Sequence, residues 1–175
     1  RGFLKKAVDV VHNAGGVFIA DEVQPGFARL GEAFWGFDFH GITPDIVTMG
    51  KPMGNGFPMA AVATKSDYLD RFCADVGYFN TFGGNPVAAA AGQAVLDTIK
   101  QENLQENARK MGLYLKTQLN SIAKQSAFVT EVRGQGMFLG IDIGQRDKKH
   151  LPDPIKTKQV INDLKAAGVL IGAAG

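Results

Sequence analysis

Two ionisable residues of opposite charge follow two apolar segments of the sequence. Asp21 follows the apolar run 17–20, and Lys51 follows the run 46–49 after a single glycine. Unbroken apolar runs of this length are typical of strands buried on both faces of a parallel sheet. In open α/β sheets, ligands bind outside the carboxyl ends of the strands, so the carboxylate and the amine are expected at one crevice. A structural ion pair, or a solvated strand end, is the alternative.

Glycines surround Lys51, at positions 50, 54 and 56. Because glycine has no Cβ, its backbone can approach a bound group closely. The chain holds 22 glycines in 175 residues, well above the usual ~7%. Many of them lie in short clusters beside apolar segments, which indicates tight loops around a binding site.

Two other segments carry groups that suit anions. Arg133 presents a planar guanidinium, which binds a carboxylate or phosphate through two parallel hydrogen bonds. Thr81 begins the segment 81–86, which places a hydroxyl and backbone amides before a predicted helix N-terminus, a favourable place for an anion. A solvated turn residue and a glycine-rich helix start without a ligand are the respective alternatives.

The apolar pattern predicts alternating helices and strands. Helices are expected over 3–12, 67–74, 87–100, 104–123 and 158–167. Strands are expected over 16–20, 45–49, 59–64, 128–133, 137–143 and 168–172, and a loop over 144–157. Asn85 and Pro86 suit the N-cap and first turn of an Ala-rich helix. This order predicts an α/β fold, with a smaller α+β unit after two long helices.

The composition excludes several classes of protein. With 45% hydrophobic and 21% charged residues, the chain is not of the disordered class. The net charge is +2 and the basic residues are spread out, so no nucleic acid or membrane partner is expected. No apolar run approaches the roughly 20 residues of a membrane helix. Cys73 is the single cysteine, and His12, His40 and His150 are far apart, so we expect no metal site and a reducing, cytoplasmic location.

Four segments, taken in order, resemble the class III pyridoxal-phosphate-dependent aminotransferases. They are Phe18 to Gln24, Pro44 to Lys51, Phe79 to Pro86 and Val132 to Gly136. Their order and spacing match the family along almost the whole chain. Residues 48–62 are most similar to the subgroup that holds alanine–glyoxylate aminotransferase 2 and the ethanolamine-phosphate phospho-lyases.

The resemblance implies a fold-type I, aspartate-aminotransferase-like fold. Residues 1–103 would form the carboxyl-terminal half of the large cofactor-binding domain, with the start of the linking helices. Residues 104–175 would form most of the α+β small domain, in truncated form. The family's amino-terminal half is not represented, so the chain is expected to be a fragment.

The resemblance also implies a pyridoxal 5′-phosphate cofactor and a role for five residues. Lys51 would carry the cofactor as an internal aldimine, and Asp21 would bind its pyridine nitrogen. A carboxylate there favours the protonated ring, which is the electron sink of the reaction. Val23 would pack against the ring and Gln24 would bond its hydroxyl. Thr81 would reach the cofactor phosphate of a neighbouring subunit, which implies a homodimer with shared sites.

The implied reaction transfers an amino group from an amino acid or ω-amine to a 2-oxo acid in two half reactions. Arg133 would bind the substrate carboxylate, and the freed Lys51 amine would move the proton at the substrate Cα. The alternatives are a phospho-lyase acting on an amino-alcohol phosphate and a non-catalytic fragment. Pro25 and Ala28 stand where the family usually has a small or β-branched residue and a glycine.

Overall fold

The computed structural model describes residues 2–145 and 151–174, which form two compact units. Unit 1 ends at Lys110, and unit 2 begins at Met111. The division falls within helix α5 (Leu104–Gln125), whereas the predicted domain boundary lies just before that helix. Helix α5 therefore contributes residues to both units.

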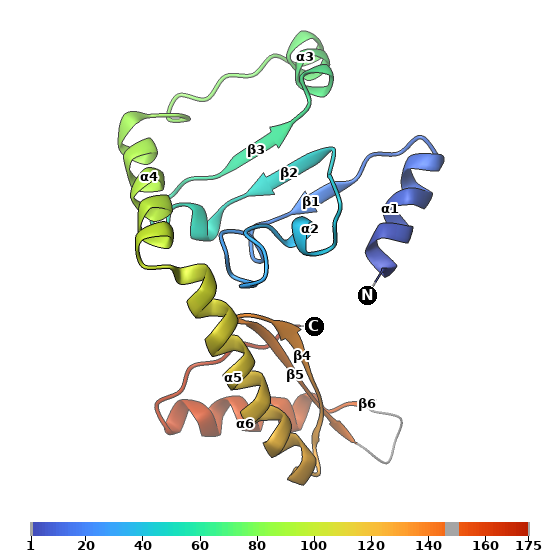
Figure 1. Ribbon diagram of the computed structural model, residues 1–175, viewed down its shortest axis with the longest axis vertical. Helices are drawn as coiled ribbons and strands as arrows, with labels where there is room; N and C mark the ends of the chain where they lie inside the picture. Colours follow the sequence, from blue (N-terminus) through green and yellow to red (C-terminus); the bar gives the residue numbers. More distant parts are fainter. Residues whose placement is uncertain (1, 146–150, 175) are drawn as a thin grey trace. The chain divides into compact units, whose positions relative to one another are not determined.

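Unit 1 is built on a three-stranded sheet of order β1–β2–β3 (Figure 1). Strands β1 (Ile19–Asp21) and β2 (Ile46–Met49) are parallel, and β3 (Ala61–Thr64) is antiparallel to β2. The register places Asp21 opposite Thr48. Because parallel strands end at the same edge of a sheet, the segments that follow β1 and β2 leave it side by side.

Four α-helices and a 3-10 helix complete unit 1 beside the first part of α5. They are α1 (Phe3–Asn13), α2 (Gly36–Phe39), η1 (Lys51–Met53), α3 (Ser66–Asp75) and α4 (Pro86–Gln101). The predicted cap of α4 is confirmed, because Asn85 Oδ1 accepts a hydrogen bond from Ala88 N at 2.9 Å and Pro86 is the first helical residue. The sequence did not predict α2 and η1, which are too short to show a period.

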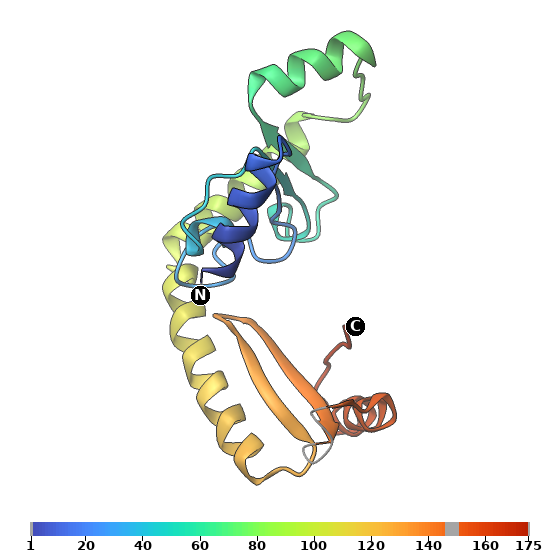
Figure 2. The same ribbon diagram turned by 90° about the vertical axis from the view of Figure 1, so that its right-hand side faces the viewer.

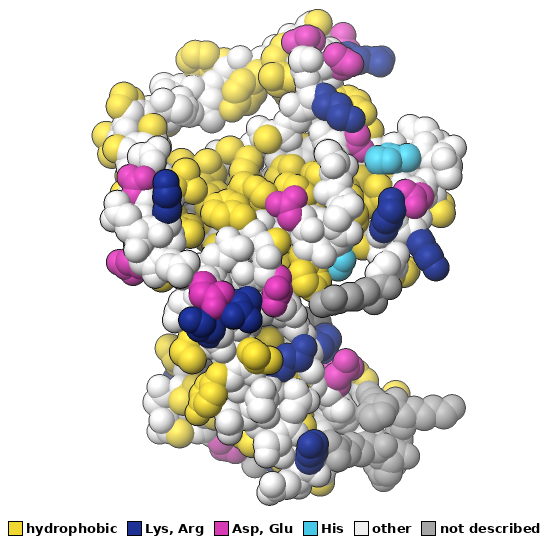
Figure 3. Space-filling model, in the orientation of Figure 1, with side chains coloured by type: hydrophobic (Ala, Val, Ile, Leu, Met, Phe, Trp, Pro, Cys, Tyr) yellow, Lys and Arg dark blue, Asp and Glu magenta, His cyan; other side chains and the backbone are white. Residues whose placement is uncertain are grey.

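The sheet of unit 1 is less buried than its sequence predicts. Val17 is 41% exposed and Ile19 51% exposed. Figure 3 shows hydrophobic side chains gathered over this sheet on one face of the unit. The expectation of burial on both faces is therefore wrong for the described residues, since none of their helices covers these side chains.

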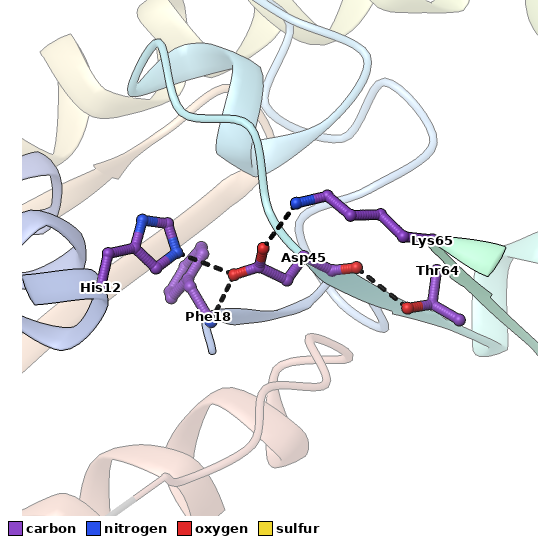
Figure 4. A network of polar contacts seen from close by, with 5 residues as sticks. All are labelled: His12, Phe18, Asp45, Thr64 and Lys65. Atoms are coloured by element: carbon purple, nitrogen blue, oxygen red, sulfur yellow. Dashed lines mark hydrogen bonds and ion pairs between the residues drawn. The ribbon is translucent and has the colours of Figure 1, made fainter. Parts of the chain in front are cut away.

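A buried carboxylate ties the elements together at the edge of the sheet where β2 begins (Figure 4). Asp45 Oδ2 accepts a hydrogen bond from Phe18 N at 2.8 Å and lies 2.8 Å from His12 Nε2. Asp45 Oδ1 accepts from Lys65 Nζ at 2.9 Å, and Thr64 Oγ1 donates to the Asp45 carbonyl at 3.1 Å. The Phe18 amide, followed by Lys65 and His12, holds the pKa of Asp45 well below its usual range. Asp45 thus joins α1 to the starts of β1 and β2 and the end of β3.

Unit 2 packs a β-hairpin between two helices. Its strands are β4 (Val129–Gln135), β5 (Phe138–Gln145) and β6 (Leu151–Pro152), and its last helix is α6 (Pro154–Ala166). Figure 2 shows the antiparallel β4–β5 pair with α5 on one side and α6 on the other. The small core consists of Ala123, Val129 and Val132, packed against Leu119, Phe128 and Ile143.

The end of the chain differs from its prediction at two places. Residues 168–172 form no strand, because no described strand lies beside them to pair. Helix α6 begins at Pro154, inside the predicted loop 144–157, because Asp153 Oδ1 caps it by accepting from Lys156 N at 2.8 Å. Residues 146–150 of that loop lie outside the described residues.

We expect Asp45→Asn to destabilise the protein in a pH-dependent manner. Because the folded pKa of Asp45 is depressed, its contribution is complete above the unfolded pKa of about 4 and is lost as the pH falls toward the folded value. The melting temperature of the variant should therefore lie below that of the wild type near neutral pH. The difference should narrow steadily below about pH 4.

Asp9→Asn is the matched control, since Asp9 is an exposed acid of α1 that lies 3.6 Å from Lys5. Exposed pairs of this kind contribute little to stability, so its melting temperature should match the wild type. A difference for Asp45→Asn that stays constant down to the acid limit would contradict the assignment.

Candidate active site

The structure places Asp21 and Lys51 at the same edge of the sheet. Asp21 is the last residue of β1, and Lys51 is the first residue of η1, one glycine after β2. Asp21 lies opposite Thr48, and Lys51 follows Thr48 by three residues. With parallel strands about 4.8 Å apart and a rise of at most ~3.6 Å per residue, the two Cα atoms lie within about 16 Å of each other.

The carboxylate of Asp21 is exposed but held in orientation. Its Oδ1 accepts hydrogen bonds from Val23 N at 3.1 Å and from Thr48 Oγ1 at 3.4 Å. No hydrogen bond or ion pair to Oδ2 is found among the described residues, which leaves that oxygen for a ligand. Sequence reasoning missed the role of Thr48, which depends on the strand register.

Lys51 has an unusual backbone and an amine without a partner. Its φ of +37° lies outside the regions that residues with a Cβ favour, a strain of about 1–3 kcal/mol that is typical of functional sites. Within the described part of the chain, no hydrogen bond or ion pair engages Lys51 Nζ. The described residues thus show no structural ion pair between Lys51 and Asp21, and both side chains are exposed, as the alternative of a solvated strand end also predicts.

Val23 and Gln24 lie on the turn that follows β1. Val23 is half-buried beside Gly50, where a Cβ would lie 3.7 Å from Val23 Cγ2 and 3.9 Å from Ala60 Cβ. Gln24 is exposed, inside a turn in which Gly26 N donates to the Glu22 carbonyl at 3.2 Å. The structure thus brings Asp21, Val23, Gln24 and Lys51 to one edge of the sheet.

Glu22 fixes this turn, and sequence reasoning missed it. Its side chain is the largest fully buried one among the described residues, at 2% exposure. Its carboxylate accepts hydrogen bonds from Gly36 N at 2.7 Å and Phe37 N at 2.9 Å, and its own amide donates to the Thr48 carbonyl at 2.9 Å. Glu22 therefore anchors both ends of the segment 22–37 to β2 and α2.

An aromatic cluster fills the same segment. Trp35 packs edge-on against Phe34 and Phe27, with ring centroids 4.8 and 5.1 Å away, and stacks on Phe37. Ala28 is buried and has a φ of +67°, a left-handed conformation that glycine adopts without a steric cost. This conformation explains why a glycine suits this position in the class III aminotransferases, which the sequence resembles.

Thr81 lies on the exposed segment between α3 and α4. The neighbouring Asn80 Oδ1 accepts hydrogen bonds from Phe82 N at 3.1 Å and Gly83 N at 2.9 Å. Two of the amides expected to face an anion are thus already bonded within the loop. In residues 2–145 and 151–174, no hydrogen bond joins Thr81 to Asp21 or Lys51.

Arg133 lies in unit 2, on β4. Its Nη1 forms an ion pair with Oδ1 of Asp142, which lies on β5. The hydrogen bond and the charge of Asp142 raise the pKa of Arg133 above its ordinary value. The guanidinium therefore stays protonated, with a carboxylate on one of its nitrogens.

The described residues contain neither a metal-binding cluster nor a membrane-spanning helix. No group of three or more His, Cys, Asp or Glu side chains in this part of the chain is placed to hold a metal ion. None of the helices built from these residues is long and apolar enough to cross a membrane.

Comparison with known proteins identifies the family. The profile of the family described as aminotransferase class-III matches residues 1–175. The chain belongs to the class-III aminotransferase family. The resemblance carried by its four motifs is therefore confirmed over the whole sequence.

Two curated relatives of this class-III chain are named for different activities, one as an aminotransferase and one as a phospho-lyase. Human alanine–glyoxylate aminotransferase 2, mitochondrial, is 47% identical over 173 residues, 98% of this chain and 34% of the relative. Ethanolamine-phosphate phospho-lyase homolog 1 of Caenorhabditis elegans is 42% identical over 178 residues, all of this chain and 38% of the relative. The expected subgroup is confirmed, and the chain spans little more than a third of the length of these relatives.

A solved structure supports the fold of the class-III chain. A phospholyase from Arthrobacter, in complex with phosphoethanolamine, matches with a TM-score of 0.92 and 46% identity, over 99% of this chain and 41% of that one. The predicted fold class, part of a fold-type I transferase with a partial large domain and most of an α+β small domain, is therefore confirmed.

We expect Glu22→Gln to loosen the turn after β1. The glutamine amide cannot accept both backbone N–H groups, so one donor would lose its partner, at a cost of about 1–3 kcal/mol. Urea unfolding at neutral pH should show the loss of stability. Proteolysis of the native protein should become faster within residues 23–35.

Asp38→Asn is the matched control, because Asp38 is an exposed carboxylate in the first turn of the adjacent α2. Its unfolding midpoint should stay close to that of the wild type. Equal effects of the two variants would show that burial of Glu22 does not hold the turn.

Proposed function

We propose that the full-length protein is a pyridoxal-phosphate-dependent aminotransferase. It would move an amino group from an amino acid or ω-amine to a 2-oxo acid. One observation carries this proposal: Asp21 offers a carboxylate and Lys51 an unpaired amine at the same edge of a parallel strand pair. Family membership supports it.

The donor set fits pyridoxal 5′-phosphate. Asp21 would bind the protonated ring nitrogen, Gln24 the ring hydroxyl, and Val23 would offer an apolar surface to the ring. Lys51 would attach the aldehyde carbon, and Thr81 would bind the phosphate. When bound, the cofactor would act as an electron sink for the charge that develops at the substrate Cα.

The residues of this chain would then divide the work of proton transfer and orientation. Asp21 would bind the ring nitrogen and thereby favour its protonated form. Arg133 would bind the substrate carboxylate and thereby fix the direction of the Cα–H bond. The amine of Lys51 would take the proton from Cα as a general base and return it as a general acid.

We also propose a homodimer with shared sites, in which Thr81 serves the neighbouring subunit. The segment around Thr81 carries Phe79 and Phe82, which are 87% and 81% exposed, and large exposed aromatics of this kind favour an interface. Sedimentation velocity of the full-length protein should give the mass of two chains, and a monomer would contradict the proposal.

The cytoplasmic location stays a prediction. The human relative carries the word mitochondrial in its name.

The assignment of Lys51 is tested by borohydride reduction of the full-length protein with pyridoxal phosphate, followed by peptide mapping. The cofactor mass is expected on Lys51, and Lys51→Arg should abolish both the label and transamination. Label on another lysine, such as Lys65, would overturn the central assignment.

The phospho-lyase remains a second candidate, because a phospholyase structure and a phospho-lyase homolog both match this chain. The two activities differ in their need for an acceptor. Transamination should require a 2-oxo acid, and phosphoethanolamine should release no phosphate. Release of inorganic phosphate without any acceptor would favour the lyase.

The third alternative is a non-catalytic role. It would be favoured over both enzymes if the full-length protein shows no change in visible absorption when it is titrated with pyridoxal phosphate.

A further inference from the structure

The hydroxyl of Thr48 makes a contact that the proposed function does not use. Thr48 lies on β2 opposite Asp21, the last residue of β1. Its Oγ1 donates a hydrogen bond to Asp21 Oδ1 at 3.4 Å. Because side chains alternate along a strand, residues that are opposite each other on neighbouring strands point to the same face of the sheet. The register of β1 and β2 therefore brings this hydroxyl to the carboxylate.

The backbone of Thr48 is also bonded to the end of β1. Its carbonyl accepts a hydrogen bond from Glu22 N at 2.9 Å. Glu22 is buried, and its carboxylate accepts hydrogen bonds from Gly36 N and Phe37 N. Thr48 therefore cannot shift along β1 without breaking its bond to an anchored residue. Since a β-branched side chain has few rotamers, the position of the hydroxyl follows from that of the backbone.

Two donors converge on one oxygen of Asp21. Val23 N donates to Oδ1 at 3.1 Å, and Thr48 Oγ1 is the second donor. One donor comes from the turn after β1 and the other from β2, so together they restrict the rotation of the carboxylate more than either does alone. Within residues 2–145 and 151–174, no hydrogen bond or ion pair engages Oδ2. The carboxylate is thus held by one oxygen and presents the other.

We propose that Thr48 is a positioning residue for the cofactor, which holds Asp21 so that Oδ2 faces the ring nitrogen of pyridoxal 5′-phosphate. The inference rests on the proposed function, in which Asp21 binds that nitrogen. It deepens the function by assigning a residue that acts through Asp21 and does not itself touch the cofactor.

The physical argument is one of preorganisation. A hydrogen bond between a carboxylate and a protonated ring nitrogen is charge-assisted, and it is strong only when donor and acceptor are aligned. Asp21 is exposed, so with the Val23 amide as its only partner its side chain would have more rotamers to lose when the cofactor binds. The hydroxyl of Thr48 removes part of that cost in advance. Its contribution should therefore appear only with a ligand that has a ring nitrogen.

The test compares two ligands on the full-length protein after its own cofactor has been removed. They are pyridoxal 5′-phosphate and its 1-deaza analogue, which has carbon in place of the ring nitrogen and keeps the aldehyde and the phosphate. The dissociation constant of each is measured by absorption titration. Thr48→Val keeps the branched shape and removes the hydroxyl. It should weaken binding of pyridoxal phosphate by about three- to ten-fold, and binding of the analogue by less than about two-fold. Thr48→Ser should restore the wild-type ratio of the two constants.

Thr64→Val is the matched control. Thr64 lies on β3 of the same sheet, and its Oγ1 donates to the Asp45 carbonyl at 3.1 Å. The same substitution there removes a hydroxyl that is bonded at the opposite end of β2 from Thr48. Whatever its effect on the melting temperature, this variant should leave the ratio of the two dissociation constants at the wild-type value.

An unchanged ratio in Thr48→Val, or an equal shift in Thr64→Val, would overturn the inference. An equal loss of affinity for both ligands in Thr48→Val would overturn it too, because the hydroxyl would then act on a part that the two ligands share. Thr48→Ala is the second variant, in case the valine protein does not fold, and it should shift the ratio in the same direction.

Asp21→Asn separates the two levels of the argument. If Asp21→Asn lowers the preference for pyridoxal phosphate over the analogue but Thr48→Val does not, only the inference fails. If Asp21→Asn leaves that preference unchanged, the contact of Asp21 with the ring nitrogen fails and the inference fails with it.

Discussion

The parallel pairing of β1 with β2 is the interaction on which the candidate site depends. It sets Asp21 opposite Thr48, whose hydroxyl holds the carboxylate, and it brings the segment with Lys51 to the same edge. The hydrogen bond from Glu22 N to the Thr48 carbonyl continues the pairing for one more residue. Because side chains alternate along a strand, Asp21 is exposed to a ligand while Glu22 is buried in the protein. One strand end thus supplies an exposed carboxylate, to which the proposed function gives the cofactor, and a buried one that holds the turn.

Two buried carboxylates brace this sheet, each in a different way. Asp45 lies before β2 and is bonded to an amide and to two cationic or protonatable side chains, from Lys65 and His12. Glu22 lies after β1, and its carboxylate accepts hydrogen bonds from two backbone amides. A buried charge is tolerated when it is fully hydrogen-bonded. The hydrogen bonds that replace water around Asp45 and Glu22 also fix the positions of their partners. Each carboxylate therefore holds one end of the β1–β2 pair in place.

The sequence predicts the elements that are specified by neighbouring residues. The structure adds the contacts between residues that are distant in the sequence. The apolar runs predict β1 and β2, and Asn85 with Pro86 predicts the start of α4, because these signals lie within a few residues of the element they specify. Glu22 and Asp142 escaped prediction because their partners come from residues 36–37 and from a neighbouring strand whose register contains an irregularity near Val129. The strand expected over 168–172 failed for the same reason, since apolar residues form a strand only beside another strand. The roles assigned to Thr81 and Arg133 rest on the family resemblance, because no pattern of spacing specifies a ligand's phosphate or carboxylate.

Three lysines of the chain differ in whether their amines have a hydrogen-bond partner. Lys65 donates to Asp45 and Lys116 donates to the Gly134 carbonyl, so both amines are engaged in holding elements together. An ion pair raises the pKa of Lys65, and a raised pKa makes an amine a poorer nucleophile at neutral pH. Lys51 has no such partner among the described residues, and its backbone is held in a strained conformation. An amine that must form and break a covalent bond is best left without a competing acceptor. In the proposed function, the strain at Lys51 would accompany the presentation of that amine at the edge of the sheet.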